Sequence, residues 1–325
     1  MTDLKQPRRE RTEHLAIIGS GPAGLTAAIY AQRAGLSPLL IAGAFPLVPG
    51  GQLTGTSIIE NFPGFPEGIP GPELVDGMRR QAIRLGARIE EDSASGIDVS
   101  SRPFRITLDG GDEVLADAVI LATGAVPRRL EVPGEEKYAG RGVSYCATCD
   151  GFLFRKKRVA VVGGGDTAME EADYLSRLAS SVTLIHRRDA FRASRAMEER
   201  IRANPAISLV LSAEVQEVKG DGRRMSAVVL KDVRSGALSE LPMDGLFVAA
   251  GRIPASSLVR GLAELDGAGH VAVAPGSSAT SVPGLFAAGD VCDPIYRQAI
   301  VAAASGCRAA LDAKRFLDAH VPKAP

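Results

Sequence analysis

Two copies of one glycine-rich pattern constrain the fold of this chain more than any other feature of its sequence. Residues Leu15–Gly43 read LAIIGSGPAGLTAAIYAQRAGLSPLLIAG, an apolar strand followed by a glycine-rich turn, an alanine-rich helix and a second apolar strand. The same order recurs in Val159–Asp189, VAVVGGGDTAMEEADYLSRLASSVTLIHRRD, with Gly163 standing 144 positions after Gly19. A single GxGxxG pattern often arises by chance. Two copies that align over their whole length predict two dinucleotide-binding units.

The glycines of this pattern have separate roles. The first permits a tight turn, the second lets the backbone approach a pyrophosphate, and the third lets helix and strand pack closely. The pyrophosphate would lie at the helix N-terminus, where free N–H groups and the helix dipole favour anions. The residues predicted to bind the dinucleotides are Gly19, Ser20, Gly21, Pro22, Ala23 and Gly24 in the first copy and Gly163, Gly165, Asp166, Thr167 and Ala168 in the second.

The two copies differ where their second strand ends, at the position that normally meets the adenosine ribose. The first copy has Ala42 and Gly43 there. A carboxylate would hold a 2′-hydroxyl, whereas a cluster of arginines suits a 2′-phosphate. The first copy has neither, so it does not look like a nicotinamide site. We interpret the second copy as an NADP(H) site that includes His186, Arg187, Arg188 and Arg192.

A third segment points to a flavin. Gly284–Asp290 reads GLFAAGD, an apolar strand that ends in Gly289 and Asp290. Such a strand end suits a flavin enzyme, with Asp290 bonding a ribityl or pyrophosphate-proximal hydroxyl. A plain turn or N-cap aspartate is the alternative. Pro294–Ser305 resembles a helix start whose N–H groups would stabilise negative charge on a reduced flavin ring.

These placements predict an α/β protein with two Rossmann-like, three-layer dinucleotide-binding domains, the NADPH domain being inserted into the FAD domain. We expect residues 1–124 to begin the FAD-binding domain, with residues 1–14 flexible. Residues 125–252 would form the NADPH-binding domain, and residues 253–325 would complete the FAD domain. The segments ATGAVP and AAGRIP pair glycine with proline at the two crossings.

The composition of the chain indicates which partners and which cellular location to expect. The chain has 38 basic and 38 acidic residues, which gives no reason to expect nucleic acid or a membrane surface as a partner. Met1–His14 lacks the apolar core of a signal peptide, and no run is long enough to cross a bilayer. We therefore expect a cytoplasmic protein, whose four cysteines are redox or structural thiols.

Between the two glycine patterns lies Cys146-Ala147-Thr148-Cys149-Asp150. A lone Cys-x-x-Cys fits half a zinc site, a redox pair or coincidence. Between two dinucleotide sites it is typical of a disulfide that receives electrons. Asp150 is the candidate acid–base group for the thiols, and a loop-capping role is its alternative. We expect no metal, because zinc wants four ligands. Cys292 and Cys307 do not form a second pair and fit small buried side chains.

With these motifs the chain resembles the low-molecular-weight, bacterial-type thioredoxin reductases over nearly its full length. Further matching motifs are GGQL at Gly50, CATCDG at Cys146 and GDVCDPIYRQA at Gly289. The resemblance implies FAD in the interrupted domain, NADPH in the inserted one, thioredoxin as substrate, and a homodimer formed through the FAD domain. It makes Cys149 the flavin-facing sulfur and Cys146 the attacking thiol. The FAD contacts that it implies come from Gly51, Gln52, Asn61, Arg297, Gln298 and Ala299.

Other functions on the same scaffold stay open at this point. The acceptor could be a peroxiredoxin or a thioredoxin-like protein, or the enzyme could be a dithiol oxidase, although an intact HRRDAFR segment argues against an oxidase that needs no NADPH. The family's loop after the cysteines often presents two aromatic residues, thought to dock thioredoxin. Here Leu153 follows Phe152.

Overall fold

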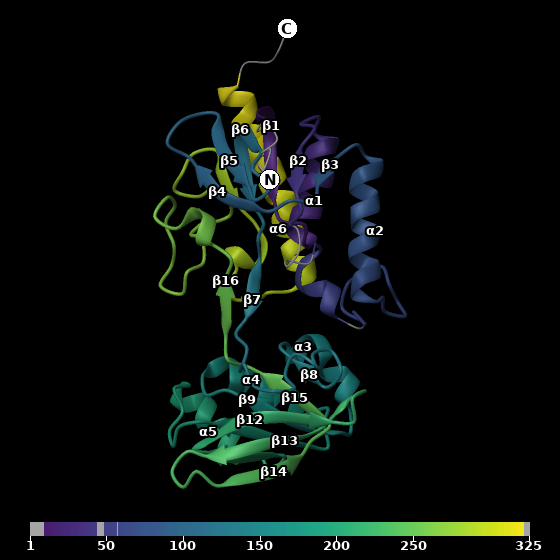
Figure 1. Cartoon of the computed structure of the whole chain (residues 1–325), viewed down its shortest axis with the longest axis vertical. Coiled ribbons are helices and arrows are strands. Elements are labelled where there is room, and N and C mark those ends of the chain that lie inside the picture. The colour runs from purple at the N-terminus through teal and green to yellow at the C-terminus, as the bar shows by residue number, and fades with distance from the viewer. Residues whose placement is uncertain (1–9, 44–48, 57, 322–325) are drawn as a thin grey trace, which may run out of the picture. The chain divides into compact units, whose positions relative to one another are not determined.

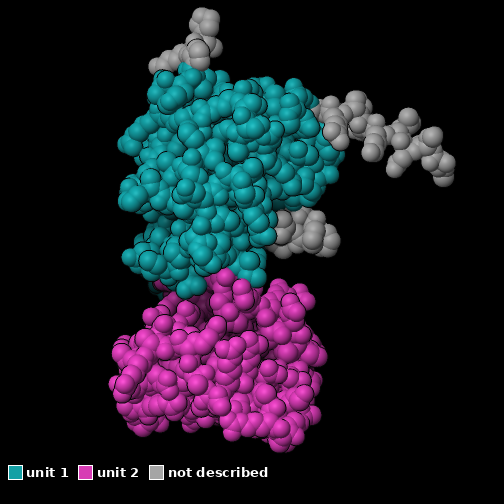
Figure 2. All heavy atoms as spheres, turned by 90° about the vertical axis from the view of Figure 1, so that its left-hand side faces the viewer, with its two compact units in different colours: residues 1–56, 62–126, 253–325 teal, residues 57–61, 127–252 magenta. Residues whose placement is uncertain are grey.

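The computed structural model describes residues 10–43, 49–56 and 58–321 (Figure 1). The chain divides into two compact units, coloured separately in Figure 2. Unit 1 is drawn from residues 1–56, 62–126 and 253–325, and unit 2 from residues 57–61 and 127–252. Each unit has its own sheets, helices and apolar core.

Unit 1 is built on a seven-stranded sheet in which the order β3-β2-β1-β6-β5-β4 forms the main path and β17 also pairs with β6. Strands β3, β2, β1, β6 and β17 are parallel, whereas β5 and β4 are antiparallel. Strands β5 and β17 pair with different halves of β6. The strand bounds are β1 Glu10–Ile18, β2 Leu39–Ile41, β3 Arg88–Glu90, β4 Ala94–Asp98, β5 Phe104–Leu108, β6 Glu113–Leu121 and β17 Leu285–Ala287.

Alternating side chains of β1 divide the core of unit 1 between the two faces of this sheet, as expected for a strand buried on both sides. Leu15 and Ile17 belong to the cluster that includes the helices, while Ala16 and Ile18 belong to a second cluster with Phe104. The helical segments are α1 Pro22–Arg33, η1 Gly51–Gly55, α2 Gly71–Arg84, η3 Ser257–Val259, η4 Gly289–Val291 and α6 Ala299–His320.

The first strand begins earlier than the sequence suggested. Glu10 pairs with Glu113 of β6, and the Arg105 guanidinium forms ion pairs with both carboxylates. The prediction of a flexible segment is therefore wrong for residues 10–14, because their charged side chains are paired along a sheet strand. Residues 1–9 lie outside the described residues.

Unit 2 has three layers. A parallel sheet has the strand order β11-β10-β9-β15-β8, and one core cluster joins it to α4 and to Ala147 of α3. A second core cluster joins it to a three-stranded antiparallel sheet, β12-β13-β14. The helical segments are α3 Ala147–Asp150, η2 Gly151–Phe154, α4 Asp166–Ser176 and α5 Arg195–Ala203. The strands are β8 Val143–Ser144, β9 Arg158–Val162, β10 Ser181–His186, β11 Ile207–Leu211, β12 Ala213–Gly220, β13 Met225–Asp232, β14 Leu238–Pro242 and β15 Gly245–Val248.

The predicted fold class, two Rossmann-like α/β domains, is thereby confirmed. The chain crosses between the units through β7 (Ala125–Pro127) and β16 (Arg252–Pro254), which pair as a two-stranded sheet. The Ala255 N–H donates to the Gly124 carbonyl at 2.9 Å, and the Arg128 N–H donates to the Gly251 carbonyl at 2.9 Å. Within the described ranges, no helix combines the length and apolar character needed to cross a membrane.

Candidate functional site

The first glycine pattern forms a tight turn between β1 and α1. Gly19 has a φ of +110°, and a Cβ on Gly24 would overlap the Gly19 carbonyl, so the helix packs directly onto the turn. Gly21 lies on an open side, where a Cβ would meet only the Gly50 carbonyl, 3.9 Å away. Helix α1 starts at Pro22 without a side-chain cap. The backbone at Gly21 is thus free to approach a pyrophosphate.

The segment that follows β2 returns to this turn. The Ser20 hydroxyl donates to the Ala42 carbonyl at 2.6 Å and accepts the Gly50 N–H at 2.9 Å. A Cβ on Gly51 would lie 3.7 Å from the Gly21 Cα. Because the Ser20 hydroxyl is used within the protein, the Ser20 backbone is the part left to contact a dinucleotide, and that predicted contact stays a prediction. Gly51 is brought beside the glycine pattern, and Gln52 follows it in η1.

The end of β17 comes to the same place. A Cβ on Gly289 would lie 2.9 Å from the Ala23 Cβ, so the strand end that carries Asp290 lies against the start of α1. The Asp293 carboxylate then accepts the N–H groups of Ile295, Tyr296 and Arg297, at 2.9 to 3.0 Å.

This aspartate-held turn sets up the start of α6. Arg297 has a φ of +51°, a conformation uncommon for residues other than glycine. Gln298 is the N-cap residue of α6, and Ala299 is its first residue; no side chain caps the helix. The predicted Arg297–Ala299 segment therefore leads directly into α6, and no side chain caps the first N–H groups of this helix. Asn61 is grouped with unit 2, and its predicted FAD contact stays a prediction.

The second glycine pattern has the same construction in unit 2. A Cβ on Gly163 would meet the Ala168 Cβ at 2.6 Å, whereas a Cβ on Gly165 would meet nothing within 4 Å. Gly165 is the N-cap residue of α4. The Asp166 carboxylate accepts the Ser194 N–H and hydroxyl at 2.8 and 2.9 Å, bonds that lower its pKa. The turn therefore leaves room for a pyrophosphate at Gly165, with the neighbouring carboxylate held by Ser194.

Three arginines surround the end of β10. Arg187, Arg188 and Arg192 are exposed, and across the described residues none of their guanidinium groups forms an ion pair. His186 is different. It is buried, its ring stacks on Phe191 with centroids 5.4 Å apart, and burial lowers its pKa. The arginines, and not the imidazole, therefore carry the positive charge that a 2′-phosphate would need, and the predicted contacts of His186, Arg187, Arg188 and Arg192 with NADPH stay predictions.

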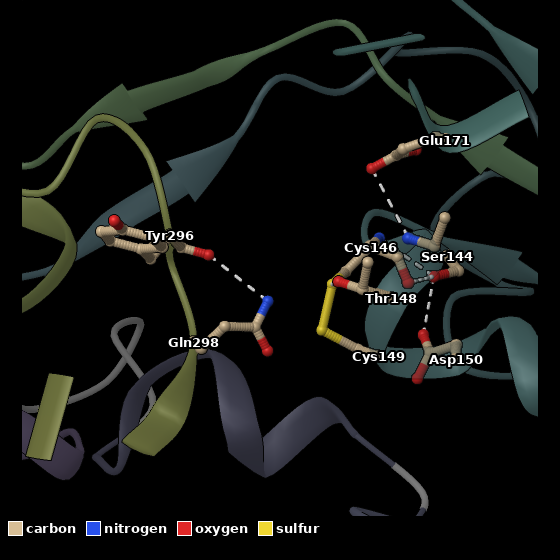
Figure 3. Close-up of a disulfide and its surroundings, with 9 residues drawn as sticks. Ser144, Cys146, Thr148, Cys149, Asp150, Glu171, Tyr296 and Gln298 are labelled. Atoms are coloured by element: carbon tan, nitrogen blue, oxygen red, sulfur yellow. Dashed lines mark hydrogen bonds between the residues drawn. A yellow bond between two sulfur atoms is a disulfide. The ribbon is translucent and has the colours of Figure 1, made fainter. Parts of the chain in front are cut away.

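The two predicted redox cysteines form a disulfide at α3 (Figure 3). Cys146 is the N-cap residue of this short helix, and Cys149 lies one turn later. The Thr148 hydroxyl lies 3.4 Å from the Cys146 Sγ, and the Ala147 N–H donates to Glu171 of α4 at 3.5 Å. The helix is thus anchored to α4 while both cysteines stay partly exposed.

The Asp150 carboxyl lies in a short hydrogen-bond chain with this pair. The Ser144 hydroxyl donates to its Oδ2 at 2.6 Å and accepts the Cys146 N–H at 3.1 Å (Figure 3). Burial raises the pKa of Asp150, and the bond from Ser144 opposes that rise. A carboxyl with a raised pKa, which follows Cys149 in sequence and is joined through Ser144 to the Cys146 N–H, is suited to exchange protons with thiols.

Comparisons with known proteins agree with this arrangement. A family model described as pyridine nucleotide-disulphide oxidoreductase matches residues 13–306. A thioredoxin reductase of Streptomyces coelicolor is 51% identical over 306 residues, covering 94% of each chain. Mitochondrial thioredoxin reductase 1 of Arabidopsis thaliana is 52% identical, covering 93% of this chain and 83% of that relative. The structure of thioredoxin reductase from Streptococcus pyogenes has a TM-score of 0.89 at 37% identity and covers 95% and 99% of the two chains.

This chain belongs to the pyridine nucleotide-disulphide oxidoreductase family. Within the family it groups with the low-molecular-weight thioredoxin reductases, as the sequence motifs indicated. These enzymes use FAD and NADPH, and the residues present fit both groups. The open backbone at Gly21 and Gly165 has room for a pyrophosphate, and the unpaired arginines after β10 suit the 2′-phosphate that distinguishes NADPH.

Ser144 is the site residue that sequence reasoning missed. Its signal was spacing, because a serine hydroxyl can accept the backbone N–H two residues further on, and Ser144 precedes Cys146 by two. After β17, the Cys292 thiol donates to the Gly289 carbonyl at 3.3 Å, and burial raises its pKa to about 12. It packs as the small apolar side chain that was expected.

Proposed function

We propose that this protein reduces the disulfide of thioredoxin with electrons from NADPH, through FAD and the Cys146–Cys149 pair. The observation that carries this proposal is the Cys146–Cys149 disulfide, together with the neighbouring Asp150 carboxyl that accepts a hydrogen bond from Ser144. The surrounding chain is about half identical to proteins named thioredoxin reductase.

Each cofactor is assigned to one unit. When bound, NADPH would supply a hydride, and FAD would supply the two-electron chemistry between that hydride and the disulfide. The open Gly21 backbone, with Gly51 and Gly289 packed beside it, supports FAD binding to unit 1. The turn at Gly165 and the arginines after β10 support NADPH binding to unit 2.

The cysteines perform the last step by thiol–disulfide exchange. In the reduced enzyme, ionised Asp150 takes the proton of the Cys146 thiol, and the Cys146 thiolate attacks one sulfur of the substrate disulfide. One S–S bond forms and one breaks, and the leaving substrate sulfur takes up a proton. The Cys149 sulfur then attacks Cys146, restores the enzyme disulfide and releases the substrate as a dithiol. Phe152 and Leu153, 47% and 39% exposed, follow the pair and are available to contact a protein substrate.

Rotation of one unit about the paired crossings would let the disulfide serve two partners in turn. Gly124 and Gly251 have φ values of +72° and +96°, and a Cβ on either would meet nothing within 4 Å. These uncrowded glycines flank the β7–β16 pair, where backbone rotation would act as a hinge.

We further propose a homodimer formed through unit 1 and a cytoplasmic location. Unit 1 exposes large apolar side chains on its helices, among them Tyr30 on α1, Ile83 on α2 and Leu311 on α6, which suit contact with a second copy. Sedimentation velocity of the holoenzyme tests the dimer, and fractionation of the source cells tests the location.

The choice of acceptor is tested by following NADPH oxidation by the purified holoenzyme. Thioredoxin from the same organism, a peroxiredoxin, a small disulfide and oxygen alone are compared at equal concentration. We expect thioredoxin to give the highest kcat/KM. A higher value with peroxiredoxin, or an undiminished rate with oxygen alone, would replace the proposal by one of those activities.

A further inference from the structure

We propose that Ser144 is a positioning residue that holds the Asp150 carboxyl to the Cys146 backbone and keeps that carboxyl hydrogen-bonded in both of its protonation states. This inference rests on the proposed function, because it concerns the proton exchange between Asp150 and the cysteines. It depends on unit 2 alone.

Strand pairing and burial hold Ser144 in place. Ser144 ends β8, where it pairs with Phe247 of β15, and it is only 4% exposed. From this rigid position its Oγ reaches three groups, the Cys146 N–H at 3.1 Å, the Asp150 Oδ2 at 2.6 Å and the Cys146 carbonyl at 3.3 Å. A single buried hydroxyl thus connects the backbone of the attacking cysteine to the acid–base carboxyl.

A hydroxyl can serve both states of Asp150 because it has one proton and two lone pairs. When Asp150 is ionised, Ser144 donates to Oδ2 and accepts the Cys146 N–H. When Asp150 is protonated, its O–H donates to the Ser144 Oγ, and the hydroxyl proton of Ser144 turns to the Cys146 carbonyl. The Ser144 Oγ, the Asp150 Oδ2 and the Cys146 N–H each keep a hydrogen-bond partner in both states, so proton transfer needs only a rotation of one hydroxyl.

Apart from Ser144, the Asp150 carboxylate has no hydrogen-bond partner among the described residues, and its Oδ1 is shielded from solvent. Helix α4, which contacts α3, brings two titratable residues close to it: Glu171, which accepts the Ala147 N–H, and Tyr174, which lies next to Gly151. Since neither of these is a cation, the bond from Ser144 is what favours the ionised form against burial.

Replacing Ser144 by alanine therefore changes proton exchange and leaves cofactor binding intact. Ser144→Ala removes one oxygen from a buried site. We expect the acidic limb of the pH profile for thioredoxin reduction to move to higher pH, with turnover at neutral pH lowered about tenfold. Ser144→Thr keeps the hydroxyl and should restore the wild-type profile. Flavin absorbance and NADPH-dependent reduction of ferricyanide, which bypasses the cysteines, should equal those of the wild type.

A double-mutant cycle separates positioning from a merely structural role. In the Asp150→Asn background, adding Ser144→Ala should change turnover by less than about twofold, because the proton transfer it supports is already lost. An unshifted pH profile in Ser144→Ala, or an equal slowing in both backgrounds, would overturn the proposal. If Ser144→Ala loses its flavin, Ser144→Cys, with its weak donor, replaces it. If the wild type does not reduce thioredoxin, the proposed function fails first, and the same cycle run with a small disulfide still tests Ser144.

Discussion

Asp150 is subject to two opposing effects at the scale of single residues. Its burial beside the disulfide raises its pKa, and the single hydrogen bond from Ser144 offsets this in part. A carboxyl whose pKa is higher in the folded state contributes stability below its unfolded pKa and loses that contribution as pH rises through the folded pKa. At neutral pH, which is above the unfolded pKa, Asp150 therefore lowers the stability of the protein that uses it.

The first prediction follows from this loss of stability at neutral pH. Asp150→Asn should raise the melting temperature at neutral pH, because an amide has no charge to bury and its oxygen still accepts from Ser144. Its turnover with thioredoxin should fall by about 10²–10⁴, the usual contribution of a general acid–base group. Thermal unfolding and steady-state kinetics measure the two effects.

Asp221 is the matched control for this prediction. Its carboxylate is exposed and accepts the N–H groups of Arg224 and Arg223, which lower its pKa. A lowered pKa gives stability that is present above the unfolded pKa and lost as pH falls. Asp221→Asn should thus lower the melting temperature at neutral pH and leave turnover unchanged. A lower melting temperature for Asp150→Asn as well would contradict this account of Asp150.

The second prediction concerns the arginines after β10. Arg188→Ala should raise the KM for NADPH about tenfold or more, since a charge-assisted bond to phosphate contributes roughly 1.5–3 kcal/mol. The KM for NADH, which has no 2′-phosphate, should stay within about twofold. Arg195→Ala is the control, because Arg195 is already paired with Glu199. Equal increases in the two KM values would show that Arg188 does not read the 2′-phosphate.

At the scale of elements, the contact between α1 and α6 holds the parts of unit 1 that are far apart in sequence. A Cβ on Gly306 of α6 would overlap the Ala23 carbonyl in the first turn of α1. The third prediction is that Gly306→Ala lowers the free energy of unfolding by about 1–3 kcal/mol, the usual cost of overpacking, and weakens FAD retention.

Gly77 in α2 provides the opposite case. A Cβ there would meet nothing within 4 Å, and alanine favours a helix over glycine. Gly77→Ala should raise the free energy of unfolding by about 0.5–1 kcal/mol. Urea titration of both variants checks the pair. Equal stability of Gly306→Ala and wild type would mean that α6 does not lie so close to α1.

Local chemistry explains which features were predictable from the sequence. The turns at Gly19 and Gly163 and the arginines after β10 were found because each feature lies within one short stretch of chain. The bond from Ser144 to Asp150 was not found, because it depends on how a strand end and a helix turn are placed in three dimensions. The start of β1 was misjudged because ion pairs with distant residues stabilise its polar end.

At the scale of the whole molecule, each unit is proposed to bind one cofactor. The fourth prediction is that NADP⁺, added to the holoenzyme, slows amide hydrogen exchange in residues 163–168 and 186–192 of unit 2. Exchange in residues 19–24 of unit 1 should stay as it was, because that turn is assigned to FAD. Protection at residues 19–24 in place of residues 163–168 would reverse the assignment.

The central claim is that electrons leave the protein through Cys146. The most direct measurement mixes NADPH-reduced holoenzyme with oxidised thioredoxin and follows thioredoxin reduction in wild type and in Cys146→Ser. The account predicts that the variant still takes up electrons from NADPH, seen as bleaching of flavin absorbance, but that its reduction of thioredoxin falls to background. Thioredoxin reduction at the wild-type rate in Cys146→Ser would contradict the account.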